Sequence, residues 1–285
     1  MEKNPTIECV ESTETSDGLL YGKFVATPLD QGYGTTLGNS LRRVLLSDLE
    51  GAAIFAVRIR DVKNNTDIKH EFSTIDGMVE DVLDLIMNLK KVTFRINDTE
   101  RSLGDDDDRK VYEVTLEAKG PGPVTSKDIK CDKTELEVIN EKVHLATLQD
   151  GAEIELRMYV RKGKSFEPSE RVDRDKDLKS VNDLPIDAIY MPVHRVNYKV
   201  ENTRVGRDTA KEKLILEVWT DGSIAPDKAI STSADILTRK FRCFKELTGD
   251  HLASGSGAIV EQEDEPKKSR EEEISIEELE LSIRA

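Results

Sequence analysis

The sequence has few cysteines, no long apolar run and no recognisable targeting segment. Only 3 of its 285 residues are cysteine, they lie more than a hundred residues apart, and none has a second cysteine or a histidine at zinc spacing. This excludes a structural zinc site and is typical of a reducing compartment. No stretch approaches the roughly 18 apolar residues of a transmembrane helix, and the amino terminus lacks a signal-peptide core. We therefore expect a soluble, unprocessed protein that does not associate with membranes.

The sequence is also short of positive charge. It has 42 basic and 57 acidic residues, which gives a net charge of −15. A surface that binds nucleic acid or anionic lipid needs clustered positive charge. Any DNA is therefore expected to be held by other components. The length allows one or two domains with large cores.

Patterns that bind phosphate or metal are missing too. The glycine-rich stretch 32–38 is not a nucleotide loop, because Gly38 is followed by Asn39 where a lysine is needed. It is not a dinucleotide fingerprint either, because Leu37 occupies the position of the third glycine. The aspartates Asp105–Asp108 lack the ligand order of a calcium loop and are typical of a solvated hairpin tip. The sequence thus predicts no catalytic, cofactor-binding or metal-binding residue.

A short amphipathic helix is predicted over residues 36–50. Thr35 or Thr36 is expected to cap its amino end, and Gly51 is expected to end it in a left-handed conformation. Apolar residues recur at i, i+4, i+7, i+8 and i+12, which forms one stripe at helical period. These residues are Leu37, Leu41, Val44, Leu45 and Leu49.

Two adjacent arginines, Arg42 and Arg43, flank this stripe. Paired guanidinium groups suit the carboxylates or carbonyls of a partner. The pattern therefore favours a contact helix. A core helix with solvated arginines is the plainer alternative.

A second helix with a sharp apolar seam is predicted over residues 227–247, with Pro226 at its first position. Its apolar residues step by 4, 3, 4 and 3, and such a seam prefers another helix as its partner. Because each large apolar side chain contributes roughly 1.5 to 3 kcal/mol when buried, this seam is expected to decide assembly. The seam consists of Ile230, Ala234, Leu237, Phe241 and Phe244.

The remainder is predicted to be mostly antiparallel sheet, so the fold class is α+β. A capping box at Ser73 and Asp76 predicts a helix that runs to Leu89. Residues 163–183 carry few apolar side chains and predict a long exposed loop. Alternating apolar residues predict strands at 18–26, 52–62, 92–96, 112–118, 154–160, 196–200 and 214–219.

The composition changes abruptly after Gly249. The stretch from Glu261 to Glu280 contains ten acidic and three basic residues. This composition predicts a disordered linker. The sequence ends in EELELSIRA, which begins like a helix and stops at Ala285.

Taken in order, these pieces resemble the alpha subunits of the bacterial-type multisubunit RNA polymerase, including those of cyanobacteria and plastids. The resemblance runs over nearly the whole chain, and the matching stretches keep one order. They are IECVES (7–12), GTTLGNSLRRVLLS (34–47), HEFSTIDGMVEDV (70–82), GPGPVTSKDI (120–129), IDAIYMPVHRVNYKVENTRVG (186–206), LEVWTDGSIAPDKAI (216–230) and EELELSIRA (277–285).

The resemblance implies a discontinuous architecture. Residues 1–52 and 184–249 would form a dimerisation module from an antiparallel sheet and two contact helices. Residues 53–183 would form an inserted, mainly β module. An acidic flexible linker would occupy 250–274, and 275–285 would be the truncated start of the carboxyl-terminal DNA-binding domain.

The resemblance also implies a non-catalytic role. Two alpha subunits homodimerise and form the platform on which the beta and beta-prime subunits assemble, one on each protomer. Catalysis lies in those large subunits, as do magnesium and zinc where they occur, and no aspartate triad such as D-F-D-G-D occurs here. The expected compartment is a bacterial cytoplasm or a plastid stroma, and DNA would be met only through the assembly. Residues implied in large-subunit docking are Gly34, Asn39, Arg42, Arg43, Asp187, Arg195 and Arg204.

The sequence departs from the family in three places. The loop 63–69 resembles an insertion and the hairpin at 105–108 is unusually acidic, and both are expected to be peripheral. The family continues into a helical DNA-binding domain of which only 275–285 stand here, so this chain is not expected to read promoter DNA. Two other readings are a generic homodimeric interaction protein and, on the aspartate run alone, a metal-dependent enzyme.

Overall fold

The computed structural model describes residues 5–97, 110–172, 177–178, 180–205 and 208–245. These residues form an α+β fold, mostly antiparallel sheet with few helices, which confirms the predicted class. The predicted hairpin tip at 105–108 and the predicted linker at 250–274 lie outside the described residues, as does 275–285.

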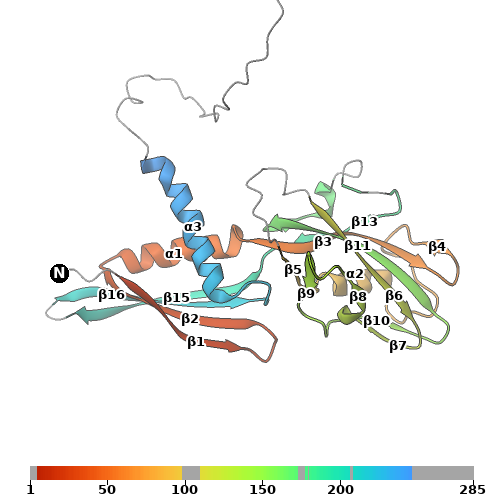
Figure 1. The fold of residues 1–285 in the computed structure, drawn as a ribbon, viewed down its shortest axis with the longest axis horizontal. Helices are drawn as coiled ribbons and strands as arrows, with labels where there is room; N and C mark the ends of the chain where they lie inside the picture. Colours follow the sequence, from red (N-terminus) through yellow and green to blue (C-terminus); the bar gives the residue numbers. More distant parts are fainter. Residues whose placement is uncertain (1–4, 98–109, 173–176, 179, 206–207, 246–285) are drawn as a thin grey trace, which may run out of the picture. The chain divides into compact units, whose positions relative to one another are not determined.

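Strands from both ends of the described chain build one four-stranded antiparallel sheet. Figure 1 shows its first strands, in red, beside its last strands, in cyan. We call residues 6–49 and 193–245 the terminal region. The sheet order is β1 (Thr6–Glu14), β2 (Leu20–Asp30), β16 (Asp208–Thr220) and β15 (Val193–Val205). β1 was not predicted as a strand, because all its side chains are exposed at the sheet edge and leave no apolar alternation.

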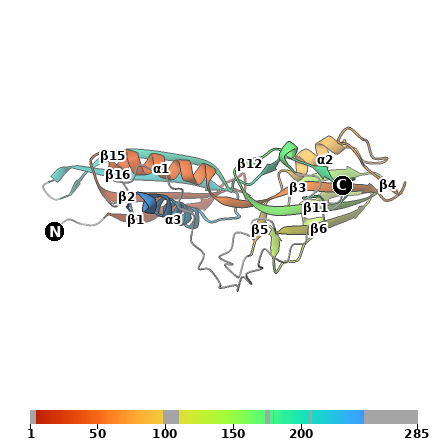
Figure 2. The same cartoon turned by 90° about the horizontal axis from the view of Figure 1, so that it is seen from above.

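Two helices pack on this sheet. Helix α1 (Tyr33–Ser47) runs along β15 and β16, as Figure 2 shows from above, and helix α3 (Pro226–Lys245) begins at the predicted proline. Leu45 of α1 and Ile230 of α3 join Phe24 of β2 in one buried cluster. Gly38 lets α1 come close, since a Cβ there would lie 2.6 Å from a ring carbon of Tyr198. The helical stripe therefore packs on the chain's own sheet.

The amino end of α1 is capped from far along the sequence. The carboxylate of Glu212 accepts hydrogen bonds from the backbone N–H groups of Gly32 and Gly34, both at 2.9 Å. A carboxylate is well suited to the unpaired N–H groups and positive dipole end of a helix. The predicted cap at Thr35 or Thr36 is wrong, because the helix has already begun at Tyr33 and Glu212 takes the capping role.

The carboxyl end of α1 also differs from the prediction. The helix ends at Ser47, and its cap residue Asp48 keeps a right-handed conformation. Gly51 lies in strand β3 (Glu50–Asp61), where a Cβ would stand 2.0 Å from the carbonyl oxygen of Tyr190. The glycine at this position therefore permits a close backbone approach, and the predicted left-handed helix end is wrong.

Residues 50–190, which we call the inserted region, contain the other sheets. The largest has eight strands, and the predicted strands at 52–62, 92–96, 112–118 and 154–160 are confirmed within it. Its strands are β8 (Ile129–Lys130), β6 (Val111–Lys119), β11 (Glu153–Lys164), β3, β5 (Phe94–Ile96) and β9 (Leu136–Val138) in order, with β4 (Thr66–Asp67) and β13 (Leu184–Pro185) also paired to β3. Two further pairs are β7 (Gly122–Thr125) with β10 (His144–Leu148) and β12 (Phe166–Glu167) with β14 (Ala188–Ile189).

Helix α2 (Val82–Leu89) covers the core of this region but starts later than predicted. The predicted start at Ser73 is wrong because the backbone of residues 77–79 pairs with β10 instead. Gly77 takes a positive φ of 81°, its carbonyl accepts from Gln149, and the N–H of Val79 donates to Thr147. The helix begins only after Asp81.

The predicted exposed loop at 163–183 is partly wrong. Its start forms β12 and a turn of 3₁₀ helix at Ser169–Arg171, and Val172 is buried. Arg161 fixes this segment through a 2.5 Å ion pair with Glu167 and a hydrogen bond to the hydroxyl of Tyr190. Polar side chains here are therefore used for internal contacts, which composition alone does not reveal.

Candidate functional site

The outer side of α1 carries the polar residues that the sequence singled out. Asn39, Arg42 and Arg43 are all exposed. At about 100° per residue, Arg43 points roughly 160° away from the buried Leu45. Within the described residues neither arginine makes an ion pair. Their charges are therefore available to another molecule.

The apolar stripe of α1 divides into a buried and an accessible part. Val44 and Leu45 are both buried, and Leu45 packs against the chain's own sheet together with the partly buried Leu41. Leu37 is 38% exposed. Tyr33, one turn earlier on the same side, is also exposed, and sequence reasoning missed it because the helix was expected to start after Thr35.

The seam of α3 divides in the same way. Ile230 is buried within the chain and Leu237 is partly buried. Ala234 is exposed, and the rings of Phe241 and Phe244 are 61% and 68% exposed. Exposed phenylalanine rings at helical spacing are typical of a surface that another protein covers.

Gly34 and Asp187, both expected at a docking surface, make internal contacts in this structure. Gly34 is buried beneath Val200 and gives its N–H to Glu212. The carboxylate of Asp187 accepts a 2.9 Å hydrogen bond from the N–H of Ser169 and a 3.0 Å contact from Lys90. These two contacts hold the pKa of Asp187 below its usual range.

Arg195 and Arg204 both lie exposed on β15. The guanidinium of Arg195 stands 4.8 Å from the ring centre of Trp219, which in turn lies 5.0 Å from the ring centre of Tyr21. Burial and the neighbouring Glu217 raise the pKa of Tyr21 to about 12, so its hydroxyl stays protonated. Nine residues of extended strand separate the two arginines by roughly 30 Å, so they cannot form one compact site.

An apolar segment of the inserted region is exposed, which was not predicted from the sequence. Phe72 is 76% exposed, and Val79, Leu83 and Met87 are also exposed. The apolar pattern predicts Val79 in one seam with Ile75, Val82, Ile86 and Leu89, and this is wrong for Val79 alone, because the other four are buried. The spacing of Val79, Leu83 and Met87 at i, i+4 and i+8 was the available indication of a second, exposed face.

Among the described residues there is no group of three or more histidine, cysteine, aspartate or glutamate side chains placed to hold a metal ion. Across the same residues, every helix is too short or too polar to span a bilayer.

Comparison with known proteins gives one consistent result. Residues 57–191 match the family described as the RNA polymerase Rpb3/RpoA insert domain. The DNA-directed RNA polymerase subunit alpha of Syntrophomonas wolfei is 45% identical over 285 residues, which is 100% of this chain and 82% of the relative. The subunits of the same name from Limosilactobacillus reuteri and Desulforamulus reducens are 44% and 45% identical over 283 residues, or 99% of this chain and 82% of each relative.

These relatives confirm the resemblance found in the sequence. They cover both ends of the chain and the inserted region, so they argue against a generic interaction protein and a separate metal-dependent enzyme. An alpha subunit takes part in nucleotidyl transfer through its polymerase and is itself non-catalytic. The chain belongs to the family of bacterial DNA-directed RNA polymerase alpha subunits.

Proposed function

We propose that this chain homodimerises through α1 and α3 and that the dimer is the platform for the large polymerase subunits. The observation that carries the proposal is the exposure of apolar side chains on both helices. Leu37 on α1 and Phe241 and Phe244 on α3 stay in water in the single chain. A second copy can bury the same surface symmetrically, as most homodimers do.

The energies favour such a dimer. Burying one large apolar side chain contributes roughly 1.5 to 3 kcal/mol, and a two-fold axis counts every residue twice. The already buried Leu45 and Ile230 hold each helix on its sheet. The proposed interface therefore consists of Leu37, Ala234, Leu237, Phe241 and Phe244, with a smaller part for Leu41.

A single charge tests this interface. Phe241→Glu leaves the single chain folded, because the ring is exposed, yet it places two carboxylates in the dimer core, which costs several kcal/mol. Phe72→Glu is the matched control, since that ring is at least as exposed, 76% against 61%, but lies on the inserted region. Sedimentation velocity is expected to show monomers for Phe241→Glu and dimers for Phe72→Glu. Stable dimers of both variants would refute the interface.

Docking of the large subunits is the second part of the proposal. Arg42, Arg43 and Asn39 are exposed on α1 and suit carboxylates and carbonyls of a beta subunit. Arg195 and Arg204 on β15 present cations for a beta-prime subunit. Asp187 supports that surface by holding Lys90 and Ser169 in place.

The docking role of Arg43 has a direct test. Arg43→Ala is expected to leave dimerisation and melting unchanged, because no described ion pair is lost, while little beta subunit is recovered with the tagged chain. Arg157→Ala is the control, since Arg157 is also exposed and pairs only with its neighbour Glu155. Equal recovery of beta by both variants would show that Arg43 is merely solvated.

The chain organisation and compartment follow from the same proposal. The terminal region would be the dimerisation module, and the inserted region would be the mainly β module between its two segments. The acidic linker at 250–274 remains part of this proposal from sequence alone. The bacterial origin of the similar proteins favours a bacterial cytoplasm over a plastid stroma.

A further inference from the structure

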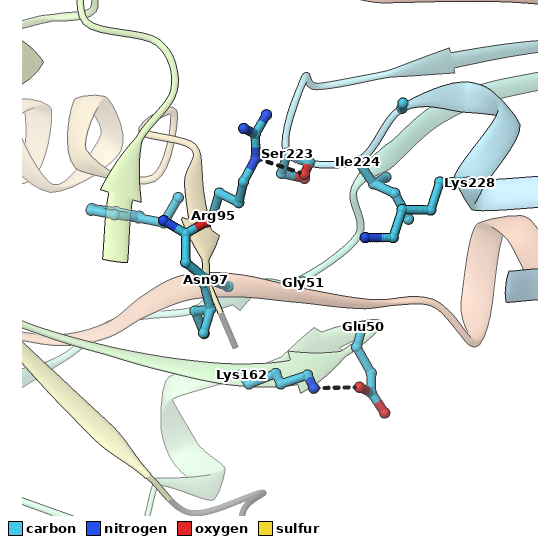
Figure 3. A pocket seen from close by; sticks show the side chains of 12 residues that line it. Glu50, Gly51, Arg95, Asn97, Lys162, Ser223, Ile224 and Lys228 are labelled. Atoms are coloured by element: carbon cyan, nitrogen blue, oxygen red, sulfur yellow. Dashed lines mark hydrogen bonds and ion pairs between the residues drawn. The ribbon is translucent and has the colours of Figure 1, made fainter. Parts of the chain in front are cut away.

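Two adjoining cavities lie where the inserted region meets the segment before α3. Their volumes are about 660 and 730 Å³, and both are lined by Glu50, Lys162, Ile224 and Lys228. Figure 3 shows Glu50, Lys162 and Lys228 around the first cavity. We call the two cavities together the junction groove. Each cavity alone has the size of a small-molecule site, and their shared lining joins them into one larger surface with room for several residues of a bound polypeptide.

One wall of this groove is held by Arg95 of β5. Its Nε donates to the carbonyl of Ser223 at 3.1 Å, and its Nη2 donates to the carbonyl of Gly222 at 2.6 Å. The first of these bonds is drawn in Figure 3. The groove is therefore built by specific contacts between the two regions.

The groove is cationic although the whole chain is acidic. The second cavity is lined by five cations, Lys162, Lys164, Lys228, Arg239 and Lys240, and by two carboxylates, Asp48 and Glu50. This leaves an excess of three positive charges in a chain of net charge −15. Such a local concentration of one sign attracts a partner of the opposite sign.

The carboxylates in the groove are already neutralised. Lys162 and Lys164 contact Glu50 at 2.9 and 3.0 Å, and Lys240 pairs with Asp48. Burial pushes the pKa of Glu50 up, but its two ammonium partners outweigh burial and leave this pKa below the ordinary value. Lys240 likewise holds the pKa of Asp48 low. Both groups therefore stay ionised and paired near neutral pH.

Two cations of the groove have no such partner. Lys228 and Arg239 are exposed, and within the described residues neither makes an ion pair or a side-chain hydrogen bond. They lie three turns apart on one face of α3, since eleven residues at about 100° each return to within about 20°. They are positioned to contact successive acidic groups of one ligand.

The proposed dimer leaves this face uncovered. At about 100° per residue, the seam from Ile230 to Phe244 points roughly 150° around α3 from the face of Lys228, Thr232, Ile236 and Arg239. The groove floor is apolar, with Leu49, Ile224 and Ile236 among its lining residues. A ligand there meets an apolar floor between cationic rims.

We infer that the junction groove binds an acidic peptide segment, with apolar residues between its carboxylates, carried by a protein partner of the polymerase. The apolar floor suits leucine-like side chains, and the cationic rim suits carboxylates. The apolar floor of Leu49, Ile224 and Ile236 favours a polypeptide over nucleic acid, because a phosphate backbone has no aliphatic side chains to bury there. This surface goes beyond the proposed dimer and large-subunit docking.

The test uses the full chain and a fluorescein-labelled peptide of four Glu-Glu-Leu repeats, measured by fluorescence anisotropy at low salt. The double variant Lys228→Glu/Arg239→Glu is expected to weaken binding at least tenfold. The control Lys127→Glu/Lys142→Glu changes the net charge equally at two exposed lysines of the inserted region and is expected to change binding less than twofold. A Gln-Gln-Leu peptide of the same length is expected not to bind.

Three results would overturn the inference. One is equal binding of the acidic peptide by both double variants. Another is tighter, groove-dependent binding of a 20-nucleotide single-stranded DNA, which would make the groove a phosphate site. The third is a monomeric Lys228→Glu/Arg239→Glu variant in sedimentation, which would place the groove inside the dimer interface. The dimer proposal itself is judged separately by Phe241→Glu.

Discussion

The inserted region and the terminal region differ in the size of their buried apolar clusters. In the inserted region, 26 described residues form one buried cluster, including Phe94, Leu116 and Leu156. In the terminal region the corresponding cluster has nine residues, while Phe241 and Phe244 stay exposed on α3. The inserted region thus completes a large core within one chain although Phe72 stays exposed on it, whereas the terminal region has a smaller core and leaves the apolar rings of α3 exposed.

This difference suits a subunit of an assembly, in which one region is stable by itself and another presents contact surfaces. A complete core gives the inserted region a shape that does not depend on partners. The terminal region holds α1 and α3 on one sheet but leaves their outer sides apolar or cationic. Its stability is therefore expected to depend on the concentration of protomers.

The largest expected effect comes from a cavity in either core. Leu156→Ala, in the centre of the inserted region, is expected to cost about 2 to 5 kcal/mol in calorimetric unfolding. It is expected to leave dimerisation unchanged below its melting temperature. Leu216→Ala, equally buried in the terminal sheet, is expected to weaken the dimer as well. Loss of the dimer in Leu156→Ala would show that the two regions are not independent.

A smaller effect is expected at the cap of α1. Glu212→Ala removes the acceptor of two backbone N–H groups, and hydrogen bonds to a charged group contribute about 1.5 to 3 kcal/mol each. Because one of the two bonds is exposed to water, we expect a loss at the lower end of their sum, about 3 kcal/mol, in urea unfolding followed by the fluorescence of Trp219, which lies in the same sheet.

Two controls make this result specific. Glu212→Gln keeps one hydrogen-bond acceptor and is expected to lose less free energy of unfolding than Glu212→Ala. Thr36→Ala, at the cap position expected from the sequence, is expected to cost under about 0.5 kcal/mol, because its hydroxyl only donates to the carbonyl of Gly32. If Thr36→Ala lost more free energy of unfolding than Glu212→Ala, Thr36 and not Glu212 would be the main cap of the helix.

The smallest effect is a pH-dependent one in the inserted region. The carboxylate of Glu80 accepts from the N–H of Thr147 at 2.6 Å and contacts His144 at 2.7 Å. Burial raises the pKa of Glu80, but these hydrogen bonds outweigh it and leave the pKa below the ordinary 4.5. The ionised group therefore stabilises the fold above that pH, and this contribution is lost as pH falls through the lowered pKa.

Glu80→Gln tests this sign. At pH 7 the variant is expected to be about 1 kcal/mol less stable than the parent chain in urea unfolding. The gap is expected to narrow as pH falls below 4.5, where the parent protonates Glu80. A gap that widens in acid would mean that the native pKa is raised.

The elements that follow from local pattern were predicted well. The stripe of α1, the seam of α3 with Pro226 at its start and most long strands are read from residues near one another in the sequence. The cap of α1 was not, because Glu212 lies 178 residues from Gly34 and only the folded sheet brings them together. The predicted start of α2 was wrong for a similar reason, because the pairing of residues 77–79 with β10 overrides a local capping box.

The sequence predicted which types of residue lie on the two contact helices better than it predicted which of them are exposed. Arg42, Arg43 and Phe241 are exposed, as contact residues should be, whereas Val44, Leu45 and Ile230 belong to the same stripes yet are buried. The helical period shows that these residues lie on one side of a helix. It does not show which of them pack on the chain's own sheet and which are left for a partner. Lys228 and Arg239 escaped notice because their cationic groove needs Lys162 and Lys164 from a distant strand.

Hydrogen exchange at several protein concentrations tests the comparison between the regions most directly. On dilution into the range where dimers dissociate, backbone amides of α1 and α3 are expected to exchange faster, because each helix loses the cover of its partner. Amides of β6 and β11 are expected to exchange at a constant rate, since the inserted core is complete in one chain. Equal, concentration-independent exchange in all four elements would contradict the account.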